Sequence, residues 1–394
     1  MLASRPSLGR SLLLSFTLLC LCFLFLFYRH HHDQRIVDFD SQAITTNPAG
    51  DTNAVQVAAE PLPPSIQEQD EKPLREPPPN VEIVGASLKS DDTSWFHRHL
   101  PGGWSKRIYV VDNSQAFLTV PKNKGREAMV YLTHIVDKYD TLASTTIFFH
   151  AARFAWHNDD PDYDALPTLK DLRLDYVRRA GYVNLRCVWV IGCPDEIHPH
   201  QDAEEASRLE AEFAAAAAGD GGAATERPPT TTKAIYKQAF EELLPGLPVP
   251  DVVAVSCCSQ FAVTREAIQR RPREDYVRFR DWLLNTPLTD DLSGRVMEFA
   301  WHSKIFPDSP VKPALGEMSL TSARLVIFGK ASVHCPSAKA CYCNLWGLCD
   351  NNSMSCTEGG CEGRYTLPKL AKLPDQWPVL GWEGEDRNFT GPLD

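Results

Sequence analysis

Patterns typical of strands and helices alternate through the middle of this chain, and this alternation constrains its fold more than any other feature. Runs rich in β-branched and aromatic residues predict strands at residues 106–113, 145–151 and 182–192, with one or two more within 251–263. Helical spacing of apolar residues predicts helices at residues 126–139, 166–180, 233–244, 273–284 and 292–306. The alternation predicts a single α/β domain with a mixed, mainly parallel sheet.

We expect this domain to span residues 81–364, followed by a C-terminal tail at 365–394. A low-complexity insertion at residues 201–232 interrupts the alternation. Its first half favours a solvent-exposed helix, and its second half is a linker rich in Gly, Pro and Thr. We therefore expect no chemistry from the insertion.

The N-terminal region carries an uncharged apolar run at residues 11–28, which is close to the minimum length for a helix that crosses a bilayer. A cleaved signal peptide is the alternative, but Arg29, three histidines and Asp33 follow the run in place of small residues. The sequence therefore predicts a cytoplasmic tail at 1–10, one transmembrane signal anchor at 11–28 and a Pro-rich disordered stem at 29–80.

The cysteines indicate the compartment. Ten of the twelve follow the apolar run, and six of these form a Cys-rich edge of the domain at residues 335–361. This cluster contains no Cys-x2-Cys pair, so it favours disulfides over the alternative of a structural zinc site. Sequons at Asn351 and Asn388 agree with a luminal C-terminal side. We expect a type II membrane protein of the Golgi or endoplasmic reticulum, with the plasma membrane as the alternative.

The formal net charge of −11 argues against a protein that binds nucleic acid by neutralising phosphates.

The first candidate site is the stretch PKNKGREAMVYL at residues 121–132, where a turn runs into a helix. A helix start binds anions, Arg126 suits phosphate or carboxylate, and Asn123, Gly125 and Glu127 complete a substrate-binding turn. The alternative is an ordinary helix start, with Glu127 favoured by the helix dipole.

The second candidate site is the segment at residues 148–166, where a strand ends at His150 and an acidic loop follows. Its acids suit Mn²⁺ or Mg²⁺, and we assign His157, Asp160 and Asp162 as ligands of a cation that holds a diphosphate. His150 and Trp156 would contact the substrate, Trp156 by stacking on a sugar. A solvated acidic loop is the alternative explanation.

The third candidate site lies in the helix predicted at residues 292–306, where Arg295, Glu298 and His302 share one side. Glu298 would take a proton from an acceptor hydroxyl, with His302 as its orienting group and Arg295 beside the substrate. Ordinary pairing on a helix surface explains the same spacing. The chain lacks the G-x-S-x-G, P-loop, H-E-x-x-H and kinase motifs, so these enzyme classes are not supported.

Five segments together resemble the fungal family named domain of unknown function 3431, from about residue 107 to residue 349: NKGREAMVYLTHIVDKYDTL, FFHAARFAWHNDDPDYDALPTLKDLRLDYVRRAGYVNLRCVWVIGCP, SQFAVTREAIQRRP, SGRVMEFAWHSKIF and VHCPSAKACYCNLWGLC. This family has no established activity. The resemblance therefore implies membership and leaves the function open.

A weaker resemblance points to glycosyltransferases. The N-x-G-R-E turn is similar to the N-x-G-R-D turn of rhamnan-type and related glycosyltransferase-like domains, and a type II anchor with a stem looks like a Golgi glycosyltransferase. These similarities imply a glycosyltransferase-A-like fold, a nucleotide-sugar donor and a glycan acceptor. The chain departs from the pattern because it has no isolated D-x-D after a strand. A glycoside hydrolase using Glu298 and Asp160, or a noncatalytic carbohydrate-binding or scaffold protein, are the alternatives.

Overall fold

The computed structural model describes residues 80–218, 227–302, 332–349, 355–368 and 372–393, all within the unit Pro73–Asp394. The expected cytoplasmic tail, the anchor at 11–28 and all of the stem except residue 80 lie outside the described residues. In the described part of the chain, no helix combines the length and the apolar character that crossing a bilayer requires.

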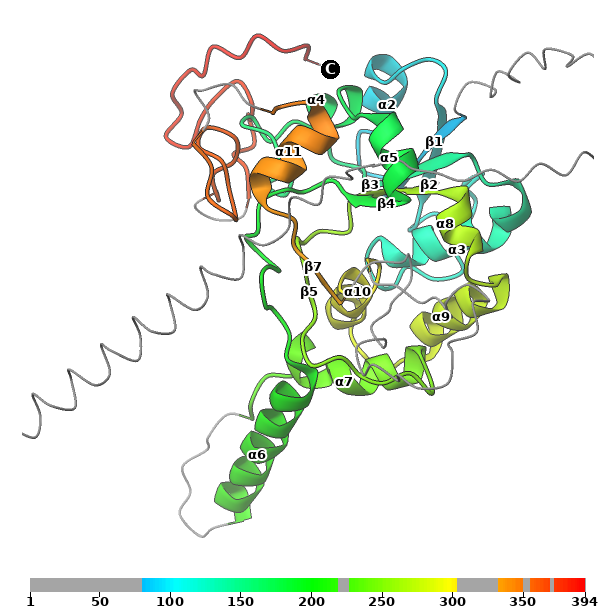
Figure 1. Cartoon of the computed structure of the whole chain (residues 1–394), viewed down its shortest axis with the longest axis vertical. Coiled ribbons are helices and arrows are strands. Elements are labelled where there is room, and N and C mark those ends of the chain that lie inside the picture. The colour runs from blue at the N-terminus through cyan, green and yellow to red at the C-terminus, as the bar shows by residue number, and fades with distance from the viewer. Residues whose placement is uncertain (1–79, 219–226, 303–331, 350–354, 369–371, 394) are drawn as a thin grey trace, which may run out of the picture. The chain divides into compact units, whose positions relative to one another are not determined.

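The main sheet has five strands in the order β2-β1-β3-β6-β4. They are β1 (Val81–Ser87), β2 (Ser105–Val110), β3 (Thr145–His150), β4 (Tyr182–Asn184) and β6 (Phe261–Thr264). Strand β1 pairs in parallel with β2 and β3, whereas β6 runs antiparallel to both β3 and β4 (Figure 1). The prediction of a mixed, mainly parallel sheet in an α/β fold is confirmed. A small second sheet pairs β5 (Ala254–Val255) with β7 (Val333–His334) in parallel.

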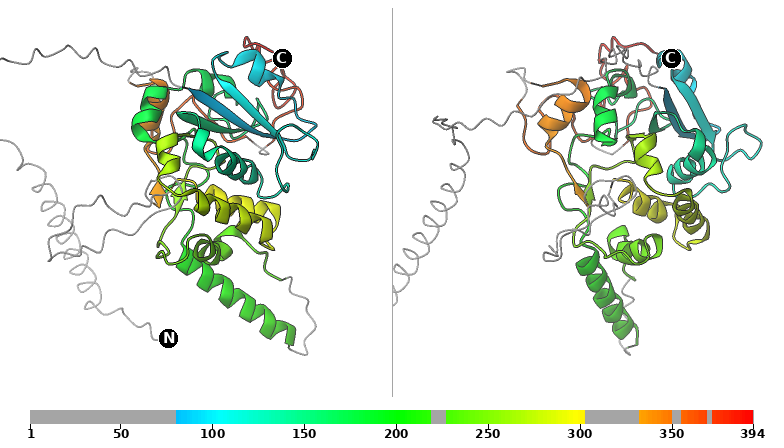
Figure 2. Two further views of the ribbon diagram at one scale, coloured as in Figure 1. Left: turned by 90° about the vertical axis from the view of Figure 1, so that its right-hand side faces the viewer. Right: turned by 45° about the vertical axis from the view of Figure 1, so that its right-hand side comes forward.

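Both faces of the main sheet are buried, because alternate side chains of each strand enter different cores. Val84 and Phe148 point into one core, and Ile83, Ile147 and Phe149 point into the other. Helices therefore cover the sheet on both sides, as the two views in Figure 2 show.

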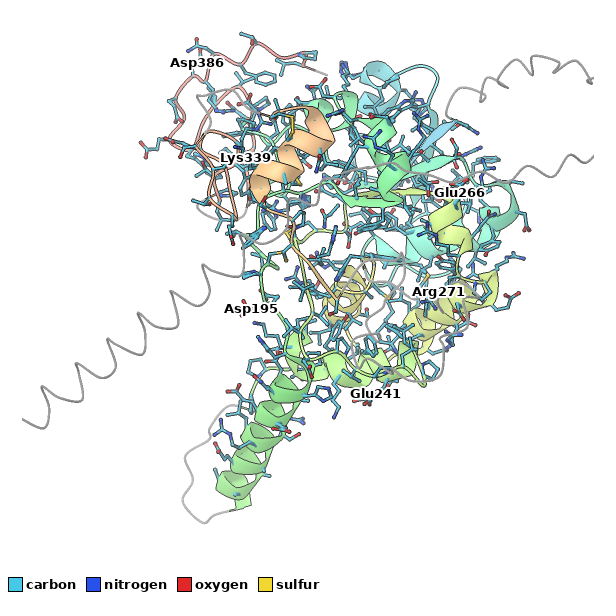
Figure 3. All side chains as sticks on the ribbon, viewed as in Figure 1. Asp195, Glu241, Glu266, Arg271, Lys339 and Asp386 are labelled. Atoms are coloured by element: carbon cyan, nitrogen blue, oxygen red, sulfur yellow. A yellow bond between two sulfur atoms is a disulfide. The ribbon has the colours of Figure 1, made fainter. Side chains whose placement is uncertain are left out.

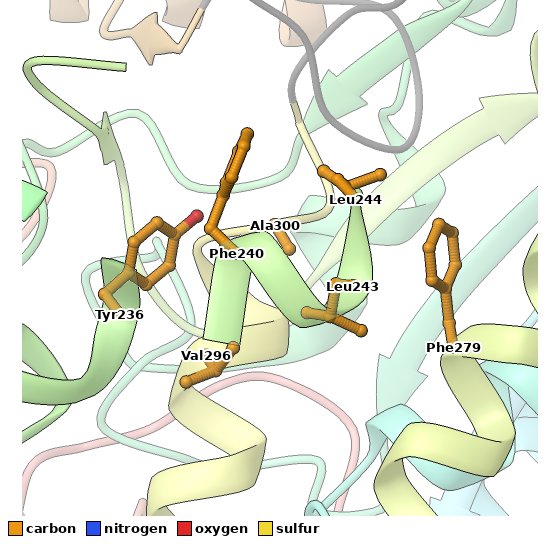
Figure 4. A pocket seen from close by; sticks show the side chains of 7 residues that line it. All are labelled: Tyr236, Phe240, Leu243, Leu244, Phe279, Val296 and Ala300. Carbon is orange, nitrogen blue, oxygen red and sulfur yellow. The ribbon is translucent and has the colours of Figure 1, made fainter. Parts of the chain in front are cut away.

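The core on the first face takes buried side chains from α3 (Ala128–Lys138), α9 (Arg273–Asn285) and α10 (Asp290–Glu298), and from α7 (Thr232–Leu243), which packs against α9 and α10. The second face is covered by four others: α2 (Ser94–His99), α4 (Ala165–Lys170), α5 (Leu174–Ala180) and α11 (Ala338–Trp346). The remaining helical segments are η1 (Tyr139–Thr141), α6 (Pro199–Ala218) and α8 (Arg265–Gln269). A small apolar void of about 10 Å³ lies between side chains of α7, α9 and α10 (Figure 4). Its volume is roughly that of one water molecule.

Several elements differ from their sequence patterns. The helix predicted at residues 126–139 as amphipathic is buried from Ala128 to Val136, because it lies between the sheet and α9. The single helix predicted at 166–180 is two helices, and in the break the Arg173 N–H donates to the Leu345 carbonyl of α11 at 2.8 Å. The strand predicted at 182–192 pairs only over Tyr182–Asn184. Tertiary contacts override the local patterns in each case.

All ten cysteines after the apolar run form disulfides, and zinc is therefore not their role. The pairs are Cys187–Cys341, Cys193–Cys335, Cys257–Cys258, Cys343–Cys349 and Cys356–Cys361. The first two bonds join the chain after β4 to the Cys-rich segment and close large loops, with sequence separations of 154 and 142 residues. A typical bond of this kind stabilises a fold by about 2–4 kcal/mol.

Two peripheral regions, the insertion and the C-terminal segment, differ in whether they pack against the rest of the domain. The part of the insertion up to residue 218 forms α6, which projects away from the main sheet with mostly exposed side chains (Figures 1 and 3). By contrast, residues 372–393 of the expected tail pack onto the loop after β3. The Trp377 Nε1–H donates to the Asp162 carbonyl at 2.7 Å, and Arg387 donates to the Asp162 carboxylate at 2.7 Å. This C-terminal segment is therefore part of the folded domain.

Candidate functional site

A cleft of about 450 Å³ opens at the carboxyl ends of β1, β2 and β3. Ser87 at the end of β1, Val111 just after β2 and His150 at the end of β3 line it. Because β2 and β3 lie on opposite sides of β1, the chain reverses its direction of strand addition here. In open α/β sheets, ligands bind outside the carboxyl ends of the strands at such a switch point.

The turn before α3 forms one wall of the cleft. Gly125 and Arg126 both have positive φ, at 72° and 51°. A Cβ at Gly125 would lie 2.5 Å from Leu283 Cδ2 of α9, so this position requires glycine. Gly125 therefore shapes the turn without lining the cleft, whereas Asn123, Arg126 and Glu127 line it directly.

Arg126 is held from α10 without being buried. Its backbone N–H donates to Asp290 Oδ1 at 3.1 Å, and its Nη2 donates to Asp291 Oδ1 at 2.6 Å. The side chains of Arg126 and Asp291 are 51% and 72% exposed, so the pair contributes little free energy. The guanidinium can therefore exchange this partner for an anionic group of a ligand.

Glu127 is the carboxylate nearest the start of α3. Burial raises its pKa, and the carboxylates of Glu298 and Asp290 raise it further, against the opposing effects of a hydrogen bond from its own backbone N–H and of the Arg126 cation. Among the residues that the structure describes, no cation lies within ion-pair distance of Glu127. A cleft carboxylate with a raised pKa is suited to accept a proton.

His150 has a fixed tautomer. The Asn158 side-chain amide donates to the carbonyls of Arg153 at 2.7 Å and Tyr163 at 2.9 Å, so its Oδ1 must accept from His150 Nε2 at 2.9 Å. Burial lowers the pKa of His150 to about 4, so the ring is neutral at physiological pH. With the proton on Nε2, His150 Nδ1 keeps a lone pair and has no hydrogen-bond partner within the described ranges.

His157 and Trp156 continue from His150 as a series of rings. The ring centroids of His150 and His157 are 4.2 Å apart, and those of Trp156 and His157 are 5.4 Å apart. Burial lowers the pKa of His157 well below its usual value, and His157 Nδ1 also has no partner in the described structure. An unpaired buried polar atom costs about 1–3 kcal/mol, and two of them adjoin this cleft.

The third candidate site lies outside the cleft lining. Glu298 Oε1 accepts from the Cys258 N–H at 2.6 Å and from Arg295 Nη1 at 2.8 Å, so its carboxylate is already engaged. His302 is fully buried, and its Nε2 lies 2.9 Å from the Ser332 carbonyl. Arg295 and Glu298 form an i,i+3 pair on α10, which is the structural explanation of their spacing.

The expected cation ligands do not converge. Asp160 Oδ1 accepts from the Asp162 N–H at 2.9 Å, which closes a turn, and Asp162 pairs with Arg387 at 2.7 Å. Neither aspartate lines the cleft that His157 lines. These residues therefore do not fit a divalent cation held between them. In the described ranges the one close group of three potential ligands is Cys257, Cys258 and Glu298, whose sulfurs are joined in a disulfide.

Three residues that the sequence patterns missed complete the site. Asp91 lines the cleft from the segment after β1, a strand that was not recognised. Asp290 lines it from the first turn of α10, where an acidic start is common and gives no functional signal. Gln260 donates to Asn158 Oδ1 at 2.9 Å from 102 residues away, and it supports the His150 tautomer.

No curated protein and no solved structure matches this chain. A family model matches residues 83–344, which is more than half of the chain and includes most of the strands and helices described above. The chain therefore belongs to the family described as protein of unknown function DUF3431.

Proposed function

We propose that this protein is a glycosyltransferase-like enzyme that transfers a sugar from a nucleotide donor to a glycan acceptor in the cleft at the end of β1. One observation carries the proposal: Arg126, Glu127, His150 and Trp156, which come from two separate segments, line the same cleft at a switch point of the sheet. The mixed, mainly parallel sheet is compatible with a glycosyltransferase-A-like fold.

Arg126 would bind the diphosphate of the donor, because an exposed guanidinium offers two parallel N–H groups to phosphate oxygens. In the reaction, the acceptor oxygen forms a bond to the anomeric carbon while the bond from that carbon to the diphosphate breaks. The departing nucleoside diphosphate takes the electron pair, and Arg126 stabilises its charge.

Glu127 would take the proton of the acceptor hydroxyl. Its place in the cleft and its raised pKa favour it over Glu298, whose carboxylate is held by Cys258 and Arg295. His150 Nδ1 would accept a hydrogen bond from a sugar hydroxyl, and Trp156 would stack on a sugar ring. None of these steps is assigned to a metal ion.

The test is binding of UDP-glucose, UDP-galactose, UDP-N-acetylglucosamine and GDP-mannose to the full-length protein in detergent, by calorimetry. Arg126→Ala should weaken the binding of at least one of them by about tenfold or more, since charge-assisted hydrogen bonds contribute about 1.5–3 kcal/mol. Arg179→Ala is the matched control, because Arg179 also pairs with an exposed aspartate, Asp175 at 2.9 Å, away from the cleft. Equal affinities of both variants and the wild type would refute the proposal.

A glycoside hydrolase is the second candidate, because Asp91, Glu127 and Asp290 place three carboxylates around the same cleft. Hydrolysis of a preformed glycoside without any nucleotide would favour it. Release of nucleoside diphosphate only when donor and acceptor are both present would favour transfer.

We also propose a type II topology, with the anchor at residues 11–28, the stem at 29–80 and the domain in the lumen of the Golgi or endoplasmic reticulum. The pairing of all ten downstream cysteines in disulfides supports an oxidising compartment. The sequon residue Asn388 is exposed in the C-terminal segment. We expect N-glycan at Asn388 or Asn351 and protection of the domain from protease in sealed microsomes, whereas digestion without detergent would reverse the orientation.

A further inference from the structure

A second cavity, of about 370 Å³, lies beside the cleft and shares a wall with it. The loop after β3 supplies Phe154, Ala155 and Trp156 to this cavity, and the C-terminal segment supplies residues 372–375 and Trp377. Ala155 and Trp156 also line the cleft at the end of β1. Trp156 therefore lines both spaces.

The aromatic residues that line the second cavity are held in place by contacts with the rest of the folded chain. Trp377 donates its Nε1–H to the Asp162 carbonyl at 2.7 Å, and the Arg387 guanidinium lies 3.7 Å from the centre of its ring. Phe154 contacts Phe389 with ring centroids 5.9 Å apart. A ligand that stacks on these rings would not have to order them first, which lowers the entropy cost of binding.

The charges of the second cavity cancel, unlike those of the cleft. Its charged lining residues are Lys372 and Asp375, which pair with each other at 3.6 Å and are 81% and 92% exposed. The cleft, by contrast, combines one arginine with three carboxylates. Rigid aromatic rings without net charge favour a ligand that is neutral and has apolar faces, which is the chemistry of an uncharged sugar.

We propose that the second cavity binds a neutral glycan, with Trp156 as the boundary between this subsite and the cleft. The identification of that glycan as the acceptor rests on the proposed function, whereas binding of the glycan does not. A chain of sugars entering from the C-terminal segment would then place its end beside Glu127 and His150. Trp377 lines this subsite and not the cleft, and we assign it as the specificity-determining residue of the subsite.

The test uses the full-length protein in detergent with neutral hexasaccharides of glucose, mannose and N-acetylglucosamine as probes. We expect at least one to bind, and Trp377→Ala to weaken that binding about tenfold or more while sugar-nucleotide affinity stays unchanged, because the variant loses the aromatic surface against which the apolar face of a sugar would pack. Trp346→Ala is the matched control, because Trp346 is also half-buried and donates its Nε1–H to a backbone carbonyl, that of Thr168 at 2.9 Å. Trp377→Phe should retain most of the affinity.

A second measurement avoids any dependence on the folding of Trp377→Ala. In the wild-type protein, the bound hexasaccharide should protect Trp377 from chemical oxidation mapped by mass spectrometry and leave Trp346 unprotected. Failure of all three hexasaccharides to bind, or equal losses in Trp377→Ala and Trp346→Ala, would overturn the proposal. Glycan binding through Trp377 without binding of any sugar nucleotide would support this subsite and refute the proposed transferase.

Discussion

The buried acids of the loop after β3 and Glu127 of the cleft differ in the partners that the folded chain provides for their carboxylates. Asp159 accepts from Cys187 N, Val188 N at 3.2 Å and the Tyr342 hydroxyl, and Asp164 pairs with Arg153. Glu127, in contrast, has no cation within ion-pair distance among the described residues. A dense acidic run is therefore a poor sign of a site when its carboxylates satisfy the fold. Glu127, which has no cationic partner among the described residues, is the better candidate.

The largest expected effect concerns Glu127. If it is the base, Glu127→Gln should lower turnover by about 10²–10⁴ and leave donor affinity nearly unchanged, because glutamine cannot accept the proton. Release of nucleoside diphosphate from donor and acceptor measures this. Glu298→Gln is the comparison, and a larger loss of turnover there would return the catalytic role to Glu298.

The next prediction compares the stability cost of removing a buried acid of the loop with that of removing an exposed acid of the cleft. Asp159→Ala leaves the Cys187 N–H, the Val188 N–H and the Tyr342 hydroxyl without their acceptor in a buried place. We expect the free energy of unfolding to fall by about 3–5 kcal/mol in chemical denaturation. Asp91→Ala, at an exposed cleft residue, should cost about 1 kcal/mol or less. Similar losses in both variants would remove the distinction between the two sets of acids.

A smaller effect concerns pH and Asp160. Burial raises the pKa of Asp160 from 3.8 to about 6, so the folded state favours its protonated form. The contribution of this group to stability is present at low pH and is lost as the pH rises through about 6, by about 1–3 kcal/mol. Asp160→Asn cannot ionise and keeps an acceptor for the Asp162 N–H. Denaturation at about pH 4 and about pH 7 should show a smaller decline in stability for this variant than for the wild type, and equal declines would contradict the assignment.

The sequence patterns predicted the α/β class, the mixed sheet, the disulfide bonding and much of the cleft. Asn123, Arg126 and Glu127 were recognisable because they lie in the turn that leads into a helix, and His150 and Trp156 because they lie at and just after the end of a strand. For these five residues, the neighbouring strand and helix patterns in the sequence were enough for recognition.

What the patterns missed depends on distant contacts. Strand β1, with the sequence VEIVGAS, contains Glu82, Gly85 and Ala86, yet it lies between β2 and β3 in the sheet, and its Glu82 pairs with Arg107 at 2.6 Å. Asp91 could not be placed without that strand. The carboxylate of Asp162 pairs with Arg387, which lies 225 residues further along the chain, and this pairing explains why Asp162 is not a free ligand for a cation. Composition near a residue cannot reveal a partner at that separation.

Hydrogen–deuterium exchange with a bound sugar nucleotide tests most directly whether the cleft is the ligand site. The full-length protein would be compared with and without each of the four donors named above. We predict slower exchange at residues 121–128 and 150–157, which contain most of the residues that line the cleft, and little change in α6 and α7. Protection confined to α6 and α7, or no protection with any of the four donors, would contradict the assignment of the cleft.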